Sequence, residues 1–300
     1  MKGGHVMDLL QLRYFQAVAR HQHVSRAAAE LRVAQPSLSR TLARLEADLG
    51  VPLFDRHGRR LVLNRFGTAF LARVDAALDE LGQGRKELDD LAGLEHGSVA
   101  VAAETLLQLS DLLAGFLAEH PGIGFRLYQS PASAMAGLLH AGQVDFCLAS
   151  QSLDDDSLEV AELSSEEALL AVPPAHRLAG RERADLDDLT DEVFVVTRPG
   201  YWHRALLDRL FAEAGRQPVI GCETDEPAAI PALVAAGLGA ALLPAMSRRE
   251  NPRRDVAWLH LDVPDCRRTL RLAWRREVYL SAAARAFRDA AAAWFTASTD

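Results

Sequence analysis

One amphipathic segment, Gln35–Gly50, restricts most strongly how this chain can fold. It has proline in its first turn and ends at glycine, as helices commonly do. Its apolar residues recur at helical spacing and share one face: Leu38, Leu42, Leu45 and Leu49. The opposite face is small, polar and cationic, with Pro36, Arg40, Ala43 and Arg44 flanked by Ser37 and Ser39. The pattern predicts a helix that packs on one side and is exposed on the other.

Two shorter helices are predicted before this segment and a hairpin after it. The first helix has apolar residues at helical spacing: Leu12, Phe15, Val18 and Ala19. Ser25 offers a side-chain oxygen to cap a second helix over residues 26–31. Residues 51–64 form two extended runs around Gly58, and the tip carries Arg56, Arg59 and Arg60. A basic hairpin in this place is a wing that can grip DNA phosphates.

Charge is divided unevenly along the chain. Residues 1–65 carry eleven basic residues against five acidic ones, a balance of +6, and the remainder carries 22 against 36, a balance of −14. Such a division favours a basic module for a polyanion joined to an acidic body. The exposed face of 35–50 suits the DNA major groove, where side chains must reach base edges without bulk, although a solvated helix face has the same pattern.

These residues together resemble the winged helix-turn-helix of LysR-type transcriptional regulators. The resemblance rests on Leu12-Arg-Tyr-Phe15, Ser25-Arg-Ala-Ala28, Ala34-Gln-Pro-Ser-Leu-Ser-Arg40, Leu45-Glu46, Leu49-Gly50 and Pro52-Leu-Phe-Asp-Arg56, and covers about 60 residues without a gap. It implies double-stranded DNA as a partner. The expected DNA contacts are Ser25, Arg26, Gln35, Pro36, Ser37, Ser39, Arg40 and Arg44, with Arg56 and Arg59 in the wing.

Residues 66–93 have the pattern of a coiled-coil helix. The apolar seam steps alternately by four and three residues through Phe70, Val74, Ala77, Leu81, Gly84, Leu88 and Leu91. We expect this linker helix to join a homodimer, from which a homotetramer is built, although packing on its own domain is the alternative. Gly82 and Gly84 weaken the middle and favour a bend or fraying there.

From residue 98 onward, strands and helices alternate, which predicts an α/β domain with mostly parallel sheets. The resemblance implies an effector-binding domain of two α/β subdomains like a periplasmic binding protein. We therefore expect a DNA-binding domain over 1–65, a dimerisation helix over 66–93 and an effector-binding domain over 94–300. Subdomain I should span about 94–168 and 275–300, and subdomain II about 169–274, with crossovers at 168–172 and 269–274.

A ligand in such a domain is expected beyond the carboxyl ends of the strands, where helix N-termini present unpaired N–H groups. The resemblance places an unidentified small-molecule effector in the cleft between the subdomains. The expected lining residues follow four strands: Glu104, Thr105, Gln151, Thr197, Arg198, Tyr201 and Thr224. Glu104 departs from the small or hydroxyl residues usual in the family, and a carboxylate effector facing it would need a compensating cation.

Other functions have weaker support in the sequence. An enzyme with a two-lobed catalytic domain fused to a DNA-binding module is the alternative, and Glu104 with His203 is the one acid/base pair we can propose for it. An architectural DNA-binding protein would leave the α/β domain without a role. Gly237-Leu-Gly lacks the third glycine of a dinucleotide fingerprint. We expect no catalytic residues, cofactor or metal site.

Cellular context follows from what the chain contains. Cys147, Cys222 and Cys266 are far apart and without C-x-x-C spacing, which favours reduced, mostly buried thiols. The longest nearly uncharged stretch, residues 233–246, is too short for a membrane helix and contains Pro244. The N-terminus has no apolar run of signal-peptide length. A cytoplasmic protein is expected.

Overall fold

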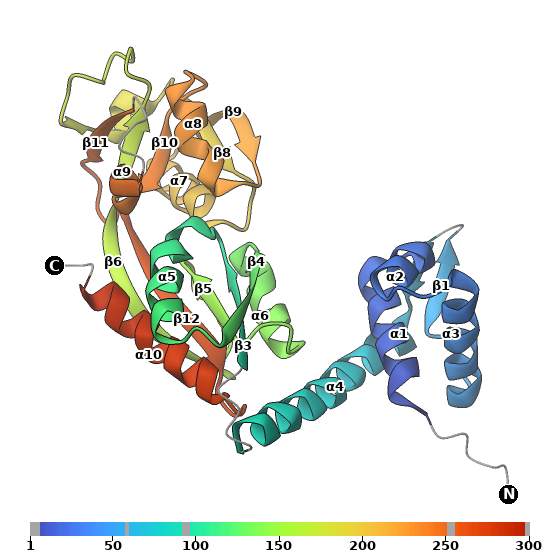
Figure 1. Ribbon diagram of the computed structural model, residues 1–300. Helices are drawn as coiled ribbons and strands as arrows, with labels where there is room; N and C mark the ends of the chain where they lie inside the picture. Colours follow the sequence, from blue (N-terminus) through green and yellow to red (C-terminus); the bar gives the residue numbers. More distant parts are fainter. Residues whose placement is uncertain (1–6, 58–59, 92–96, 251–255, 298–300) are drawn as a thin grey trace, which may run out of the picture. The chain divides into compact units, whose positions relative to one another are not determined.

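The structure, a computed structural model, describes residues 7–57, 60–91, 97–250 and 256–297. The chain divides into two compact units between residues 92 and 93. Figure 1 shows the elements of the first unit, which are α1 (Leu9–His21), α2 (Val24–Glu30), α3 (Gln35–Leu49), β1 (Phe54–His57), β2 (Arg60–Leu63) and α4 (Arg65–Leu91). None of the helices in the described ranges is long and apolar enough to span a membrane.

The first unit is built around the apolar faces of α1, α2 and α3. Asp8 and Gln11 form a reciprocal capping box at the start of α1. The predicted apolar positions Leu38, Leu42 and Leu45 of α3 are buried, and α3 ends at Gly50 in the left-handed region, with φ +73°. The helix predicted from Pro36 and Gly50 is therefore confirmed at both ends.

The expected cap of the second helix is wrong. Helix α2 begins at Val24, one residue before Ser25, and its N-cap His23 makes no side-chain capping hydrogen bond. The Ser25 hydroxyl instead donates to the side-chain oxygen Oε1 of Gln35 at 3.4 Å. Ser25 thus links the second helix to the start of the third.

The predicted hairpin is confirmed, with β1 and β2 antiparallel. The Glu46 carboxylate fixes its start by accepting from the backbone N–H of Leu53 at 2.7 Å. Asn64 caps the next helix by accepting from the N–H groups of Phe66 and Gly67. A Cβ on Gly67 would lie 2.1 Å from the Leu53 carbonyl oxygen, so the close approach of α4 to the hairpin requires glycine.

Helix α4 is continuous through Gly82 and Gly84, so the fraying expected there as an alternative to a bend is not found in the described backbone. Its first half packs on its own unit, because Val74 is buried and Phe70 contacts Phe15. Val74 is therefore buried in its own unit and Phe70 is partly buried there, which is the alternative of packing on the helix's own domain. Those two side chains complete the core of the first unit.

The second unit contains two α/β lobes (Figure 1). Subdomain I contains β3 (Gly97–Ala103), α5 (Ser110–Glu119), β4 (Ile123–Gln129), α6 (Ala132–His140), β5 (Phe146–Ala149) and α10 (Ala282–Ala297). Strand β3 pairs in parallel with both β4 and β5. Phe287 of α10 packs among Phe116, Phe125 and Phe146, so the predicted return of the C-terminal helix to the first lobe is confirmed.

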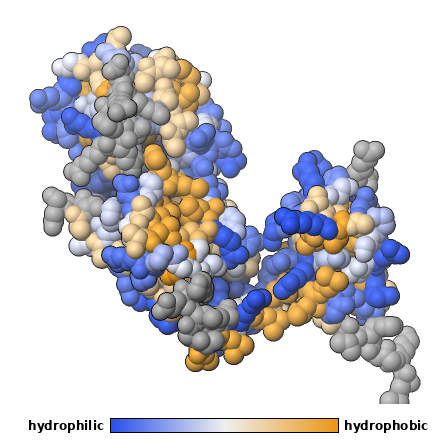
Figure 2. Space-filling model, viewed as in Figure 1, coloured by the Kyte–Doolittle hydropathy of each residue, from blue (hydrophilic) through white to orange (hydrophobic). Residues whose placement is uncertain are grey.

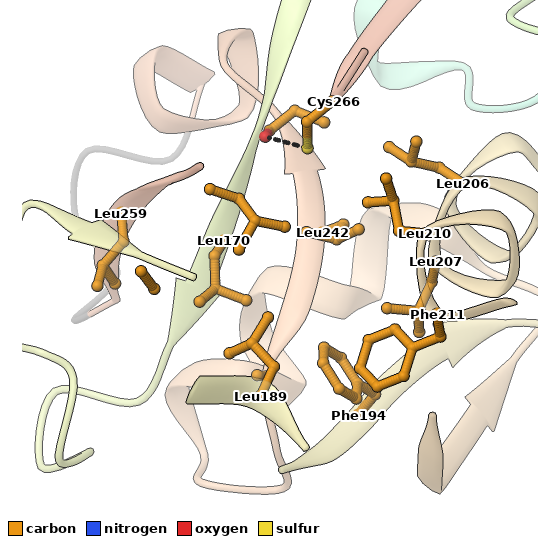
Figure 3. Packing of buried hydrophobic residues seen from close by; sticks show 14 of the residues in the cluster. Leu170, Leu189, Phe194, Leu206, Leu207, Leu210, Phe211, Leu242, Leu259 and Cys266 are labelled. Atoms are coloured by element: carbon orange, nitrogen blue, oxygen red, sulfur yellow. Dashed lines mark hydrogen bonds between the residues drawn. The ribbon is translucent and has the colours of Figure 1, made fainter. Parts of the chain in front are cut away.

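Subdomain II contains β7 (Arg183–Ala184), β8 (Val193–Thr197), α7 (Trp202–Glu213), β9 (Val219–Thr224), α8 (Ile230–Ala235), β10 (Ala241–Pro244), α9 (Met246–Glu250) and β11 (Ala257–Leu261). Figure 3 shows its core, where Phe194 of β8 meets Phe211 of α7 edge to face with ring centroids 5.5 Å apart. Strands β8 and β9 are parallel, whereas β10 and β11 are antiparallel to β6 (Leu158–Val172). The sheets are thus mixed rather than mostly parallel.

Two long antiparallel strands connect the lobes, β6 and β12 (Arg267–Arg275). Residues 168–172 of β6 pair within subdomain II, as expected for the first crossover. The second crossover lies earlier than predicted, because Leu270 and Leu272 belong to the subdomain I core and Cys266 to that of subdomain II. Residues 269–274 therefore belong with subdomain I, and the expected boundary at 274 is several residues too late.

Candidate DNA-binding surface and effector cleft

The outward face of α3 has the residues predicted for it. Gln35, Pro36, Ser39, Arg40 and Arg44 are exposed and Ser37 is half-buried. The Arg40 side chain turns back along the helix, and its Nε donates to the Pro36 carbonyl at 3.3 Å. This hydrogen bond is weak at that length, so Arg40 can exchange it for a base or phosphate acceptor.

A basic hollow of about 310 Å³ lies on the same unit, lined by Arg20, His21, Gln22, His23, Arg26 and Arg60. Glu30 neutralises part of this charge, because it pairs with both Arg20 and His21. Arg26 and Arg60 form no ion pair in the described part of the chain. Arg26 was predicted as a DNA contact, and Arg60, which the sequence places at the hairpin tip, lines the same hollow. The Arg56 side chain and all of Arg59 lie outside the described residues.

The distal half of α4 exposes apolar side chains. Leu81, Leu88 and Leu91 are 56%, 67% and 77% exposed, and Ala77 is also exposed. Hydrophobic colour is visible along this helix in Figure 2. A helix with such a surface is normally covered by a partner.

The two lobes of the second unit meet at Glu104, which follows β3. Its carboxylate is 2% exposed, and it accepts from the backbone N–H of Ser150 at 2.8 Å and of Trp202 at 3.0 Å. Ser150 follows β5 in subdomain I, and Trp202 is the first residue of α7 in subdomain II. Glu104 therefore bridges the lobes as a buried acceptor and does not line an open cleft.

Two further predicted residues also lie at this junction. The Gln151 side-chain amide donates to the Gly200 carbonyl at 3.1 Å, and the Tyr201 hydroxyl donates to the Asp225 carbonyl at 3.3 Å. The Asp225 carbonyl also accepts from the amide of Gln129. The predicted Gln151 and Tyr201 are thus brought together, but their polar groups are already engaged with the backbone.

The remaining predicted lining residues are dispersed. Thr197 is completely buried at the end of β8, and its hydroxyl has no partner among the described residues. Arg198 is exposed, and the Thr224 hydroxyl accepts from the N–H of Glu226. Of the seven predicted effector residues, Thr105 alone lines the cavity between the lobes.

That cavity has a volume of about 30 Å³. Its lining includes residues that sequence reasoning missed, mainly from α7, α9 and β12: Gln108, His203, Met246, Ser247 and Arg268. This volume accommodates one or two water-sized groups, so a larger ligand requires the lining to rearrange. His203 was named from the sequence only as a partner of Glu104 in the enzyme alternative. Arg268 was not named, because no local sequence motif surrounds that residue.

Arg268 is the cation of this cavity and is 3% exposed. Its guanidinium donates to Glu166 at 2.5 Å and to the side-chain oxygen of Gln108 at 3.0 Å, and it lies over the ring of Trp202. Its Nε–H and the Nδ1 of His203 are buried without a partner in the described chain. Such orphan groups point to a ligand or ordered water.

Burial shifts the titration of two groups here in opposite senses. Desolvation raises the pKa of Glu104, opposed by the N–H groups of Ser150 and Trp202 and by the charge of Arg268. Desolvation lowers the pKa of His203 to about 3, and the charge of Arg268 adds to this shift. His203 is therefore a neutral imidazole at physiological pH. No hydrogen bond joins its side chain to Glu104 in the described structure, so the acid/base pair of the enzyme hypothesis is not formed.

The fold and these two sites define a DNA-binding transcriptional regulator with a ligand-binding domain. Two family models match: the "Bacterial regulatory helix-turn-helix protein, lysR family" over residues 9–68, and the "LysR substrate binding domain" over residues 92–296. The chain belongs to the LysR family of transcriptional regulators.

Curated relatives agree along nearly the whole chain. The HTH-type transcriptional regulator YybE of Bacillus subtilis, itself uncharacterized, is 37% identical over 94% of this chain and 97% of its own length. The RuBisCO operon transcriptional regulator of Allochromatium vinosum is 33% identical over 94% and 95%. These relatives are named as regulators, and the enzyme alternative finds no support among them.

Solved structures extend the comparison. The crystal structure of CbnR complexed with its target DNA matches with a TM-score of 0.67 at 25% identity, covering 95% of this chain and 99% of CbnR. The effector-binding domain of QuiR in complex with shikimate matches with a TM-score of 0.60 at 26% identity, covering 67% of this chain and 98% of that domain.

Proposed function

We propose that this regulator binds a partly palindromic DNA site as a homo-oligomer in the cytoplasm and responds to a small-molecule effector held between its two lobes. The proposed organisation is a DNA-binding domain over 1–65, a dimerisation helix over 66–93 and an effector-binding domain over 94–300. In line with the core clusters, we assign residues 269–274 to subdomain I.

DNA recognition is proposed to divide between two groups of residues. Gln35, Ser39 and Arg40 present hydrogen-bonding groups on the face of α3 and suit base edges. Arg26, Arg44, Arg56, Arg59 and Arg60 suit phosphates, and the exposed Ser25, Pro36 and half-buried Ser37 complete the surface. The complex of the related CbnR with its target DNA supports DNA as the partner of this unit.

Pairing of subunits is proposed through the distal half of α4. Ala77, Leu81, Leu88 and Leu91 provide an exposed apolar stripe, which suits a second copy of the same helix. A homodimer formed in this way joins two DNA-binding domains, and a homotetramer would double that number.

Effector control rests on one observation: Arg268, which lines the cavity between the lobes, has a buried Nε–H without a partner among the described residues. A ligand that fills this cavity contacts both lobes. Its binding therefore stabilises one arrangement of the two lobes over the other arrangements. Allosteric coupling between two sites is typically about 1–3 kcal/mol, and we expect coupling of this size between the effector and DNA. The shikimate complex of the related QuiR domain supports a small molecule as effector.

A combined experiment tests this proposal on the full chain. DNA flanking the protein's own gene is used in footprinting, and a metabolite library is screened by thermal shift. We expect a protected region with two half-sites, and a ligand that raises the melting temperature without being consumed. Turnover of a library member, or no footprint on any flanking DNA, would contradict the proposal.

A further inference from the structure

The N-terminus of α7 has an anion from its own chain. Helix N-termini attract negative charge because their first N–H groups are unpaired and the helix dipole is positive there. Helix α7 has no acidic residue in its first turn, and its N-cap Tyr201 makes no side-chain capping hydrogen bond. The Glu104 carboxylate fills that position, accepting from the N–H of Trp202 across 98 positions of sequence.

The same carboxylate has a second donor on the opposite lobe. Its other oxygen accepts from the N–H of Ser150 at 2.8 Å. Two backbone donors from two lobes are an arrangement in which a bound carboxylate ligand would be held. Glu104 thus occupies this position, and it is 2% exposed, so no second anion can reach these donors while it is there.

The adjacent cavity has no spare positive charge. Arg268 is already paired with Glu166 at 2.5 Å, and Glu104 lies within its electrostatic reach. Two carboxylates around one guanidinium oppose the entry of a third negative group. Two hydrogen-bonding atoms on the lining residues have no partner among the described residues: the Nε–H of Arg268 and one ring nitrogen of His203, both on side chains more than nine-tenths buried.

We propose that Glu104 is the resident anion of the cleft, that it excludes carboxylate ligands from the N-terminus of α7, and that the cavity beside it binds an uncharged oxygen-bearing ligand through Arg268 and His203. This proposal rests on the proposed effector control and determines the chemical class of the effector. Carbonyl and hydroxyl compounds belong to that class, whereas free acids do not.

Formate and formamide test the proposal, because they have nearly the same size and shape and differ in charge. Binding to the full chain is followed by saturation transfer to the carbon-bound proton of each probe, in buffers of equal chloride. For the wild type we expect transfer to formamide and only background transfer to formate. Ala228→Leu, which fills the cavity from its lining, should reduce the formamide signal to background.

Glu104→Ala vacates the anion position and leaves both N–H donors unpaired. We expect formate transfer to rise several-fold in this variant, and its melting temperature to recover with added formate but not with formamide. Glu119→Ala, an exposed residue of α5, is the matched control and should behave as the wild type. If Glu104→Ala does not fold alone, its refolding yield from urea should rise with formate and not with formamide.

Three results would overturn the proposal: saturable formate binding by the wild type, no formamide binding by the wild type, or equal effects of the two probes on Glu104→Ala. None of them bears on DNA footprinting or on the library screen. The proposed function can therefore stand or fall separately.

Discussion

The ring of Phe70 lies 5.3 Å from the ring of Phe15, so the start of α4 is part of the DNA-binding unit. Val74, one turn further, is also buried in that unit. The apolar seam predicted from one repeating pattern therefore has two parts. Its first part stabilises the unit to which it belongs, and its second part, from Ala77 to Leu91, is exposed.

These two parts predict different mutant phenotypes. Leu88→Asp should leave folding intact and dissociate the oligomer, because an unpaired carboxylate in an apolar interface costs several kcal/mol. Phe70→Ala should instead destabilise the first unit, by at most about 3–5 kcal/mol since its ring is only partly buried. Sedimentation and urea unfolding separate the two effects. Ala72→Asp, on the exposed side of the helix, is the control, and an unchanged oligomer in Leu88→Asp would refute the dimerisation helix.

Sequence-specific recognition should depend on the face of α3. Gln35→Ala or Arg40→Ala is expected to weaken binding to the specific site by about 1–3 kcal/mol for each hydrogen-bonded base that the side chain no longer reaches. Binding to random duplex should change less, because the phosphate-binding arginines are unaltered. Fluorescence anisotropy on both duplexes at one salt concentration measures the difference. Equal weakening on both would show that these side chains bind phosphates only.

The basic hollow and the wing should act through charge. Each of Arg26→Ala, Arg56→Ala and Arg60→Ala should reduce the magnitude of the log–log salt slope of DNA binding by about 0.9 if the arginine neutralises one phosphate. Arg20→Ala should change it less, because Arg20 is paired with Glu30. Titrations at several salt concentrations give the slopes. An unchanged slope for Arg60→Ala would remove Arg60 from the DNA-binding surface.

Local sequence pattern predicted the elements of this fold better than it predicted the cleft. Helix α3 was predictable because Pro36 and Gly50 mark its ends and its leucines share one face. The first half of β6 was missed because it alternates glutamates with apolar residues on a half-exposed strand, which resembles a loop. Local pattern also failed for the Ser25 cap, because the helix begins one residue earlier, at Val24, and Ser25 lies inside it.

The cleft depends on contacts between residues that are distant in the sequence. Arg268 meets Gln108 across 160 positions, and neither residue belongs to a local motif. The strand-end rule found Glu104 and Gln151, because both follow strands of subdomain I. It gave no information on which polar groups the backbone would already satisfy, as it does for Gln151 and Tyr201.

The buried hydroxyl of Thr197 allows a test of what an unsatisfied polar group costs this fold. It has no hydrogen-bond partner among the described residues, so it contributes a desolvation cost. Thr197→Val removes the hydroxyl at nearly constant volume and should raise the free energy of unfolding by about 1 kcal/mol. Thr105→Val, at the cavity, should leave stability nearly unchanged. Urea unfolding measures both, and a loss of stability in Thr197→Val would indicate a partner for the hydroxyl.

His203 should make the protein sensitive to acid. Its pKa is lowered to about 3 in the folded chain from an ordinary value of 6.5, because burial disfavours the imidazolium. Between these values the unfolded chain binds a proton at this position and the folded chain does not. The free energy of unfolding should therefore fall as the pH decreases below about 6.5, by up to about 1.4 kcal/mol per pH unit.

His203→Phe keeps an aromatic ring and removes the titrating group. As the pH falls from about 7 to about 5, the free energy of unfolding of the wild type should therefore fall relative to that of the variant. Urea unfolding at a series of pH values measures this difference, in which the contributions of other titrating groups largely cancel. His260→Gln, a substitution at an exposed histidine, is the control and should leave the pH dependence closer to that of the wild type. Parallel curves for the wild type and His203→Phe would mean that the imidazole is solvated or paired in the folded protein. The assignment of His203 as a neutral group in the cavity would then be wrong.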